Sequence, residues 1–197
     1  IKIFSKGDYS FKDKYDKFNF EIFKNNNELI FDTKVEIVNN PIQLDEIDYK
    51  KKKNIFSDVN FSGQLFVNNT IKFDNISFIE NQNSFSISNL YLSNDKKIID
   101  FDKLQLSYLN NNKKLNQLNI SKENKKFKLI SENFDGKSII KNLINGNSKN
   151  NILERFKNFN IEIILNSNHF FIDDKAYLKK IRGNIKIEKN KIKFGNI

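Results

Sequence analysis

An apolar pattern that returns every fourteen residues constrains this chain most. Between positions 71 and 134 the pattern apolar-x-apolar-x-x-apolar-x-apolar occurs five times in succession. Lys113 and Glu132 are the two register positions that are not apolar, and the residues inside each apolar pair are polar or amphipathic. We therefore expect this region to present one apolar and one polar face. The apolar register residues are Ile71, Phe73, Ile76, Phe78, Phe85, Ile87, Leu90, Leu92, Ile99, Phe101, Leu104, Leu106, Leu115, Leu118, Ile120, Phe127, Leu129 and Phe134.

The spacing within each copy predicts a bulged β-strand. Alternation with a period of two is typical of a strand with one buried face. The step of three, as between Phe73 and Ile76, would send the second pair to the opposite face. A β-bulge absorbs one residue and keeps both pairs on one side, and it also bends the strand. The expected bulge positions are 74–75, 88–89, 102–103, 116–117 and 130–131.

Each copy supplies eight strand residues and six linker residues. This length suits an antiparallel meander, and no helical period of 3.6 is present. A parallel β-helix remains an alternative, although its coils are usually longer and its corners rich in glycine. The sequence therefore predicts an all-β fold: a curled antiparallel meander whose bent strands form a U-shaped, repeating β-groove.

Strand signals also precede the regular array. Segments 42–49 and 56–61 carry the same signature at irregular spacing, and looser alternation occurs at 18–22, 29–31 and 35–37. We expect strands at all of these positions, with the bulged meander proper extending over residues 42–134.

A longer repeat relates residues 61–76 to residues 181–197. Gly63 aligns with Gly183, and a glycine within a strand often marks a bend or a close backbone approach. The chain is therefore interpreted as a single segment, 1–197, of a longer repeat protein, with the next β-module beginning in 147–197. The absence of methionine agrees with a segment that lacks its own start.

One helix is expected between the modules, over residues 135–146. Asp135 is a candidate N-cap, Ile139 and Ile140 begin an apolar stripe, and Gly146 is a candidate stop. We expect this helix to cap one mouth of the curled sheet.

Composition excludes several classes of function. The absence of cysteine rules out disulfide frameworks and thiolate metal sites. No apolar run reaches the ~18–20 residues of a membrane span, and no signal peptide is visible. The net charge of +10 would favour phosphate on nucleic acid or lipid, but abundant Asn, Lys and Ile are also what an AT-rich genome produces. The densest basic cluster, Lys50–Lys53, is expected to lie in a loop.

Candidate catalytic residues are sparse. His169 is the single histidine, and no nucleophile or acid is placed in sequence to work with it. Asp173 and Asp174 are interpreted as a turn, and with His169 they would be too few ligands for a metal. No phosphate-binding glycine loop occurs. The sequence therefore predicts a protein that is not an enzyme and that uses no cofactor or metal.

Three features resemble the AsmA-like superfamily, in particular its large YhdP- and TamB-type bacterial envelope proteins. They are the array of bent strands, the segment DGKSIIKNLING at 135–146, and the ending NIEIILNSNHFFIDDKAYLKKIRGNIKIEKNKIKFGNI at 160–197. Together they cover residues 42–197. The resemblance implies a protein anchored in the inner membrane that crosses the periplasm and carries phospholipids towards the outer membrane. It implies that the apolar register residues line the groove, and it offers no catalytic residue.

The apolar face must be covered by something, and the residues leave two possibilities open. The sheet could fold onto itself as a sealed sandwich, or it could form an open groove covered by lipid acyl chains. The first would suit a structural or adhesive repeat protein of the cell surface, and the second a bridge-like lipid-transfer protein. Nucleic-acid binding is disfavoured, because no basic stripe is interleaved with exposed aromatic residues.

Overall fold

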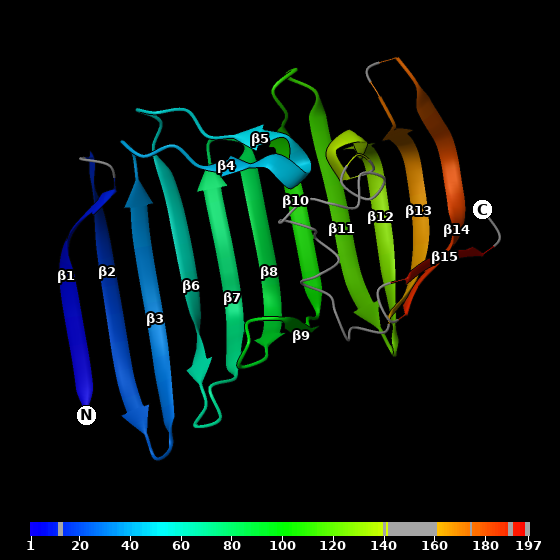
Figure 1. Ribbon diagram of the computed structural model, residues 1–197. Helices are drawn as coiled ribbons and strands as arrows, with labels where there is room; N and C mark the ends of the chain where they lie inside the picture. Colours follow the sequence, from blue (N-terminus) through cyan, green and yellow to red (C-terminus); the bar gives the residue numbers. More distant parts are fainter. Residues whose placement is uncertain (12–13, 140, 142–160, 174, 189–190, 196–197) are drawn as a thin grey trace.

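The computed structural model describes residues 1–11, 14–139, 141, 161–173, 175–188 and 191–195. Thirteen strands form one sheet, in the order β1-β2-β3-β6-β7-β8-β10-β11-β12-β13-β14-β15, with β9 also paired to β8 (Figure 1). All neighbours are antiparallel except β12 and β13, which run parallel. The predicted all-β meander is confirmed. The strands of the sheet are β1 (Lys2–Phe11), β2 (Lys14–Asn25), β3 (Glu28–Ile37), β6 (Ser57–Leu65), β7 (Ile71–Glu80), β8 (Asn83–Leu92), β9 (Ile98–Asp100), β10 (Lys103–Leu109), β11 (Leu115–Glu123), β12 (Lys126–Asp135), β13 (Ile161–Phe171), β14 (Tyr177–Glu188) and β15 (Lys191–Gly195).

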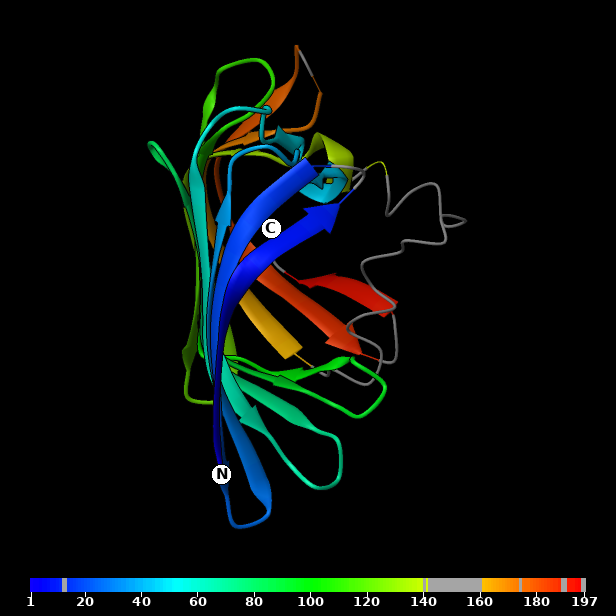
Figure 2. The same ribbon diagram turned by 90° about the vertical axis from the view of Figure 1, so that its left-hand side faces the viewer.

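The sheet is curled and open. Figure 2 looks along it from the β1 side and shows strands that bend along their length, so that one face is concave and the other convex. β1 and β15 stand at the two ends of the strand order and are not paired to each other. Because each strand bends along its length, the sheet is U-shaped in cross-section, and the two ends of the strands form its two rims (Figure 2).

Bulges bend the first two copies of the repeat at the expected positions. The pairing of β6 with β7 shifts between Ser62 and Gly63, which leaves Asp74 as the extra residue of β7. On β8 the matching residue is Asn89, which has a positive φ of 49°. Because both strands carry the extra residue at the same level, Phe73 stays opposite Leu90 and the apolar pairs remain aligned.

Gly63 is required by this bulge. A Cβ built on Gly63 would lie 2.1 Å from the carbonyl oxygen of Lys72 and 2.9 Å from the Cα of Phe73. The close backbone approach expected for this glycine is confirmed. Its counterpart Gly183 lies in β14, and the β6–β7 and β14–β15 pairs are both antiparallel.

The later copies depart from the predicted register. In the third copy the strand is interrupted after Asp100, so Phe101 still shares a face with Leu104. The fourth copy has no bulge at 116–117, because β10 and β11 pair continuously from Leu109↔Leu115 to Lys103↔Ser121. In the fifth copy the ladder skips Glu132 rather than residues 130–131.

Residues 38–56, here called the roof segment, also differ from expectation. They contain β4 (Gln43–Leu44), the short 3₁₀ helix η1 (Asp45–Ile47) and β5 (Tyr49–Lys50). β4 and β5 pair with each other and do not join the large sheet. The segment instead crosses the concave side near one rim (Figures 1 and 2). The signature at 42–49 arises because Ile42, Ile47 and Tyr49 pack down onto that face.

The crossover between β12 and β13 begins with the predicted helix. Residues 137–139 and 141 are helical, and the carboxylate of Asp135 accepts a hydrogen bond from the N–H of Lys137 at 3.2 Å. Ile140 and the remainder of the predicted helix, residues 142–146, lie outside the described residues. In the part that is described, no helix is long and apolar enough to cross a membrane.

Candidate functional site: an apolar groove

The concave face carries continuous rows of side chains that are apolar except at Thr33. Residues directly opposite each other in paired strands point to the same face. One row runs through Phe20, Thr33, Phe61, Ile76, Ile87, Leu104, Ile120, Leu129 and Leu165. A second runs through Phe18, Val35, Val59, Phe78, Phe85, Leu106 and Leu118. We call this surface the groove.

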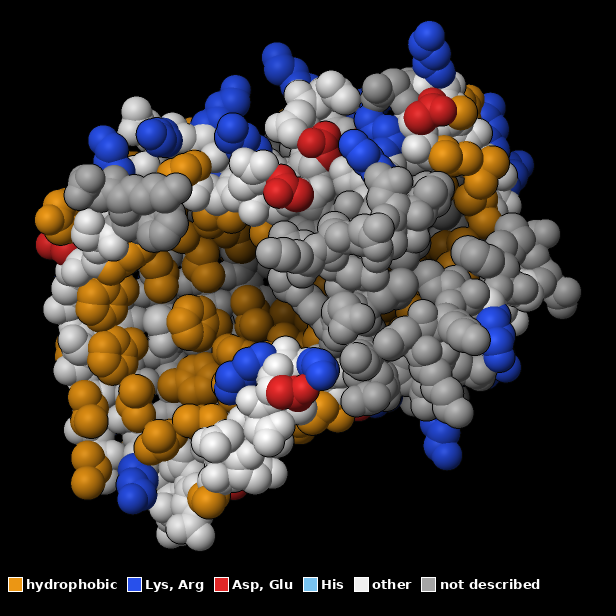
Figure 3. Space-filling model, viewed as in Figure 1, with side chains coloured by type: hydrophobic (Ala, Val, Ile, Leu, Met, Phe, Trp, Pro, Cys, Tyr) orange, Lys and Arg blue, Asp and Glu red, His pale blue; other side chains and the backbone are white. Residues whose placement is uncertain are grey.

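Within the described residues, no segment covers the groove over β1, β2, β3, β6 and β7. Figure 3 shows apolar side chains gathered over these strands in a hollow, with charged side chains at its rims. Rings line this part: Phe31 lies 5.5 Å from Phe73 and 6.3 Å from Phe61, and Phe18 stacks on Phe20 at 5.9 Å. Most of these side chains are half-buried. An uncovered apolar surface of this kind marks an interaction site.

The roof segment covers the groove over the next strands. Tyr49, 2 % exposed, contacts the rings of Phe78, Phe85 and Tyr108 at centroid distances of 4.7 to 5.8 Å. Its hydroxyl donates to the carboxylate of Glu80 at 3.0 Å. Burial and the negative charge of Glu80 raise the pKa of the Tyr49 phenol, so the ring stays neutral at physiological pH.

One charged residue ties the roof segment to β2, and another holds the segment together from within. The carboxylate of Asp16 accepts the backbone N–H groups of Val38, Asn39 and Asn40 at 2.9 to 3.1 Å. Burial alone would raise the pKa of this carboxyl, but those hydrogen bonds outweigh it and lower the pKa. The ammonium of Lys51 is fully buried and donates to the carbonyls of Val38, Asn40 and Lys52 at 3.0 to 3.2 Å.

Lys51 therefore corrects the expectation that Lys50–Lys53 simply decorates a loop. Its three neighbours in the cluster are exposed, as expected, but Lys51 is internal to the roof segment. Burial lowers the pKa of its ammonium, while the charges of Glu80 and Asp16 act in the opposite direction.

Most of the predicted lining residues lie on the groove face. Twelve belong to its two apolar clusters, and Ile71, Leu118 and Leu129 share the face through their partners in the ladder. Phe134 is buried against the ring of Phe170 at 6.0 Å. The twelve are Phe73, Ile76, Phe78, Phe85, Ile87, Leu90, Leu92, Phe101, Leu104, Leu106, Ile120 and Phe127.

Two predicted lining residues do not face the groove. Ile99 is 50 % exposed, because Leu92 pairs with Ile98 and Tyr91 with Asp100, which leaves Ile99 as the extra residue. Ile98 takes its place in the cluster. Leu115 is 44 % exposed, since without a bulge at 116–117 it alternates away from Leu118.

Apart from β7, the open part of the groove lies outside the predicted fourteen-residue array. Phe18, Phe20, Phe31 and Phe61 were not among the predicted lining residues, although alternation at 18–22 and 29–31 already indicated strands there. The alternation itself could have identified them, because the apolar residues of an alternating strand share one face. Phe20 and Phe61 lie in the same ladder row as Ile76, which was a predicted lining residue.

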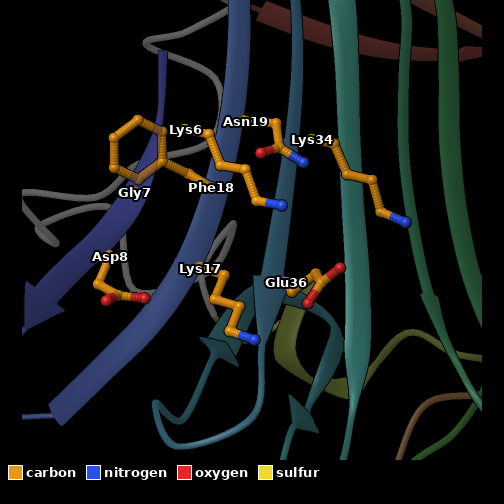
Figure 4. A pocket seen from close by; sticks show the side chains of 8 residues that line it. All are labelled: Lys6, Gly7, Asp8, Lys17, Phe18, Asn19, Lys34 and Glu36. Atoms are coloured by element: carbon orange, nitrogen blue, oxygen red, sulfur yellow. The ribbon is translucent and has the colours of Figure 1, made fainter.

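A second hollow lies on the polar, convex face. It has a volume of about 300 Å³ and is lined by Lys6, Asp8, Lys17, Asn19, Lys34 and Glu36 around Gly7 and Phe18 (Figure 4). Lys34 is already paired with Asp58 at 3.3 Å. Exposed charges of both signs on a shallow surface do not define a ligand, so the groove is the stronger candidate.

His169 lies on β13 between β12 and β14. Its ring lies 5.8 Å from that of Tyr177, and its backbone pairs with Asn133 and Lys179. Within the described residues, no three His, Asp or Glu side chains converge as a metal site would require. The carboxylate of Asp173 accepts the N–H groups of Lys175 and Ala176, as in a turn, and Asp174 lies outside the described residues.

Comparison with known proteins gives no relative: no family model, curated protein or solved structure matches the chain.

Proposed function

We propose that this chain is a segment of a bridge-like lipid-transfer protein of the AsmA-like type, whose groove holds phospholipid acyl chains. The observation that carries the proposal is the phenylalanine-lined concave face of β1, β2, β3, β6 and β7, which no described segment covers (Figure 3). Apolar surface of this extent is unfavourable in water, and acyl chains would cover it while their headgroups stay in solvent. The polar convex face would remain hydrated.

The dimensions of the open part suit an acyl chain. Five neighbouring strands have four spacings of ~4.8 Å, so the groove floor from β1 to β7 extends about 19 Å. One leaflet of a bilayer core is about 15 Å thick, half of the ~30 Å total. A single chain lying across the strands would therefore be covered along its length.

The charge at the rim supports a phospholipid rather than a neutral apolar cargo. The exposed lysines Lys50, Lys52 and Lys53 lie on the roof segment, and the chain has a net charge of +10. Ammonium groups at a rim would meet the phosphates of headgroups that remain outside the groove. The further proposal, transfer between the inner and outer membranes across a bacterial periplasm, rests on the resemblance of the sequence pattern.

A second candidate function is a structural or adhesive repeat with a sealed core. It is favoured by the buried cluster on the later strands, where Leu90, Phe101 and Phe127 are 7, 6 and 3 % exposed. The two functions differ at the open part of the groove, which a sealed repeat would not leave accessible to lipid.

Native mass spectrometry of the chain purified from bacteria, followed by lipid extraction, tests the proposal. We expect phospholipid bound to the wild type. Phe20→Asp places a charge on the groove face and should release the lipid, whereas Asn25→Asp adds the same charge at an exposed position of the same strand and should retain it. A folded wild type without lipid, or equal retention by both variants, would contradict the proposal.

A further inference from the structure

The rim of the open groove beside the roof segment is basic. Figure 3 shows Lys and Arg side chains along the upper edge of this part of the molecule. Three exposed lysines belong to this edge, Lys14, Lys52 and Lys53, and we call them the basic rim. Lys14 is on the groove face itself, because it alternates in phase with Phe18 along β2.

Hydrogen bonds fix where these lysines lie. The carbonyl of Lys14, the first residue of β2, accepts a hydrogen bond from the side chain of Asn40 at 3.4 Å. The carbonyl of Lys52 accepts the ammonium of Lys51 at 3.0 Å, and the same ammonium donates to the carbonyls of Val38 and Asn40 just beyond β3. The basic rim therefore lies at the adjacent ends of β2 and β3, where the open groove meets the roof segment.

Charge is sorted along the roof segment. Its acidic residues all fall within 45–48, at the other end of the segment, where Asp48 accepts a hydrogen bond from the side chain of Asn111 just beyond β10. At the β2–β3 end the charge of Asp16 acts on the ammonium of Lys51, and both groups are buried. These two charges offset each other, so the exposed lysines dominate the outward charge of this rim.

The opposite rim of the open groove has a different composition. Two turns form it, residues 25–28 between β2 and β3 and residues 66–70 between β6 and β7. Neither turn contains a lysine or an arginine, and asparagine is their commonest residue. Val67, in the second turn, is 73 % exposed. Charge therefore distinguishes the two rims, and an anion is favoured at the one beside the roof segment.

We propose that the basic rim binds the phosphate of an anionic phospholipid whose acyl chains lie in the open groove. This inference rests on the proposed function and adds a headgroup class and a position to it. Ammonium groups attract anionic headgroups. Phosphatidylglycerol keeps the negative charge of its phosphate, whereas the amine of phosphatidylethanolamine offsets it. The rim therefore selects lipids by headgroup charge and places the headgroup on the roof side of the groove.

Competition between these two lipids tests the selection. The chain is incubated with vesicles of equal parts phosphatidylglycerol and phosphatidylethanolamine, and its bound lipid is identified by native mass spectrometry. We expect several-fold enrichment of phosphatidylglycerol, and about equal binding of both lipids by the triple variant Lys14→Gln, Lys52→Gln, Lys53→Gln. Wild type that binds lipid without a preference would overturn the role of the basic rim and leave the proposed function standing. Wild type without any lipid would overturn both.

A second triple variant, Lys6→Gln, Lys17→Gln, Lys24→Gln, removes the same charge elsewhere. Lys6 and Lys17 line the convex hollow, and Lys24 precedes the turn at the opposite rim. All the substituted lysines are exposed, so both triple variants should fold, which circular dichroism checks. We expect the second variant to keep the preference for phosphatidylglycerol. Loss of the preference in both variants would contradict the proposal, because net charge alone would then attract the lipid.

Two further additions separate a lipid headgroup from other phosphates. Inorganic phosphate should leave the bound lipid in place, because it gains nothing from the groove. Displacement of the lipid by inorganic phosphate at an equal concentration would overturn the proposal in favour of a site for free phosphate. A short DNA duplex that displaces the lipid, and whose binding needs the basic rim, would overturn it in favour of nucleic acid.

Discussion

The hydroxyl of Tyr108 donates a 2.7 Å hydrogen bond to the backbone carbonyl of Ile47, which lies 61 residues earlier in the chain. Tyr108 is on β10 and Ile47 closes η1, so this bond connects the floor of the groove to its roof segment. Tyr108 is fully buried, and its ring packs against Tyr49 and Phe85. The covered part of the groove is therefore held by specific polar contacts as well as by apolar packing.

Removing that hydroxyl should loosen the roof segment. Tyr108→Phe leaves the carbonyl of Ile47 without its donor, and we expect a loss of about 1–2 kcal/mol in the free energy of unfolding in urea. Hydrogen exchange should increase in residues 42–50 more than in the sheet. Tyr15→Phe is the control, because Tyr15 is 66 % exposed and should change stability by less than about 0.5 kcal/mol. Equal effects of the two changes would show that the bond does not hold the roof segment.

The buried tyrosines should make stability depend on alkaline pH. Burial raises the pKa of Tyr49 and Tyr108, and it raises that of Tyr9 to about 12. Their contribution is fully present below the unfolded pKa of about 10 and is lost as pH rises towards the folded pKa, by ~1.4 kcal/mol per pH unit for each tyrosine. Urea unfolding between pH 8 and 11 should show this decline, and it should be shallower in Tyr49→Phe. The same slope in the variant would mean that Tyr49 ionises freely in the folded chain.

Gly63→Ala should be destabilising because of the bulge at Asp74. The added methyl would collide with the backbone of β7 at Lys72, and overpacking of this kind costs about 1–3 kcal/mol. Gly195→Ala, on β15, is the matched control, since no atom lies within 4 Å of the Cβ position. Thermal unfolding of the two variants is the measurement. Tolerance of alanine at 63 would place the bulge elsewhere.

The sequence predicted the sheet and most of one face from periodicity alone. Alternation with a step of three identified the bulges at Asp74 and Asn89, because the apolar pairs on both sides are strong and the residues between them are polar. The same pattern gave a wrong prediction at Leu115. The fourteen-residue repeat required a bulge at 116–117, but β11 has none. Leu115 is exposed instead, and a pattern of residue types cannot distinguish an exposed leucine from an inward one.

The roof segment could not be predicted from the same pattern. Ile42, Ile47 and Tyr49 match the strand signature, yet they pack onto the sheet from above rather than pair within it. Burial of Lys51 depends on three carbonyls supplied by the loop's own backbone, and these leave no mark in the sequence. The open part of the groove was missed for another reason: the spacing before residue 71 is irregular, so the phenylalanines of β2 and β3 do not fall into the fourteen-residue register.

Site-specific photo-crosslinking in living bacteria tests directly whether acyl chains occupy the groove. Phe31 lies on the groove face and Asp32, its neighbour in β3, points to the convex face. With benzoylphenylalanine at each position in turn, we expect phospholipid adducts at 31 and few at 32. Folded protein that gives no lipid adduct at 31, or equal adducts at both positions, would contradict lipid binding in the groove and favour a sealed structural repeat.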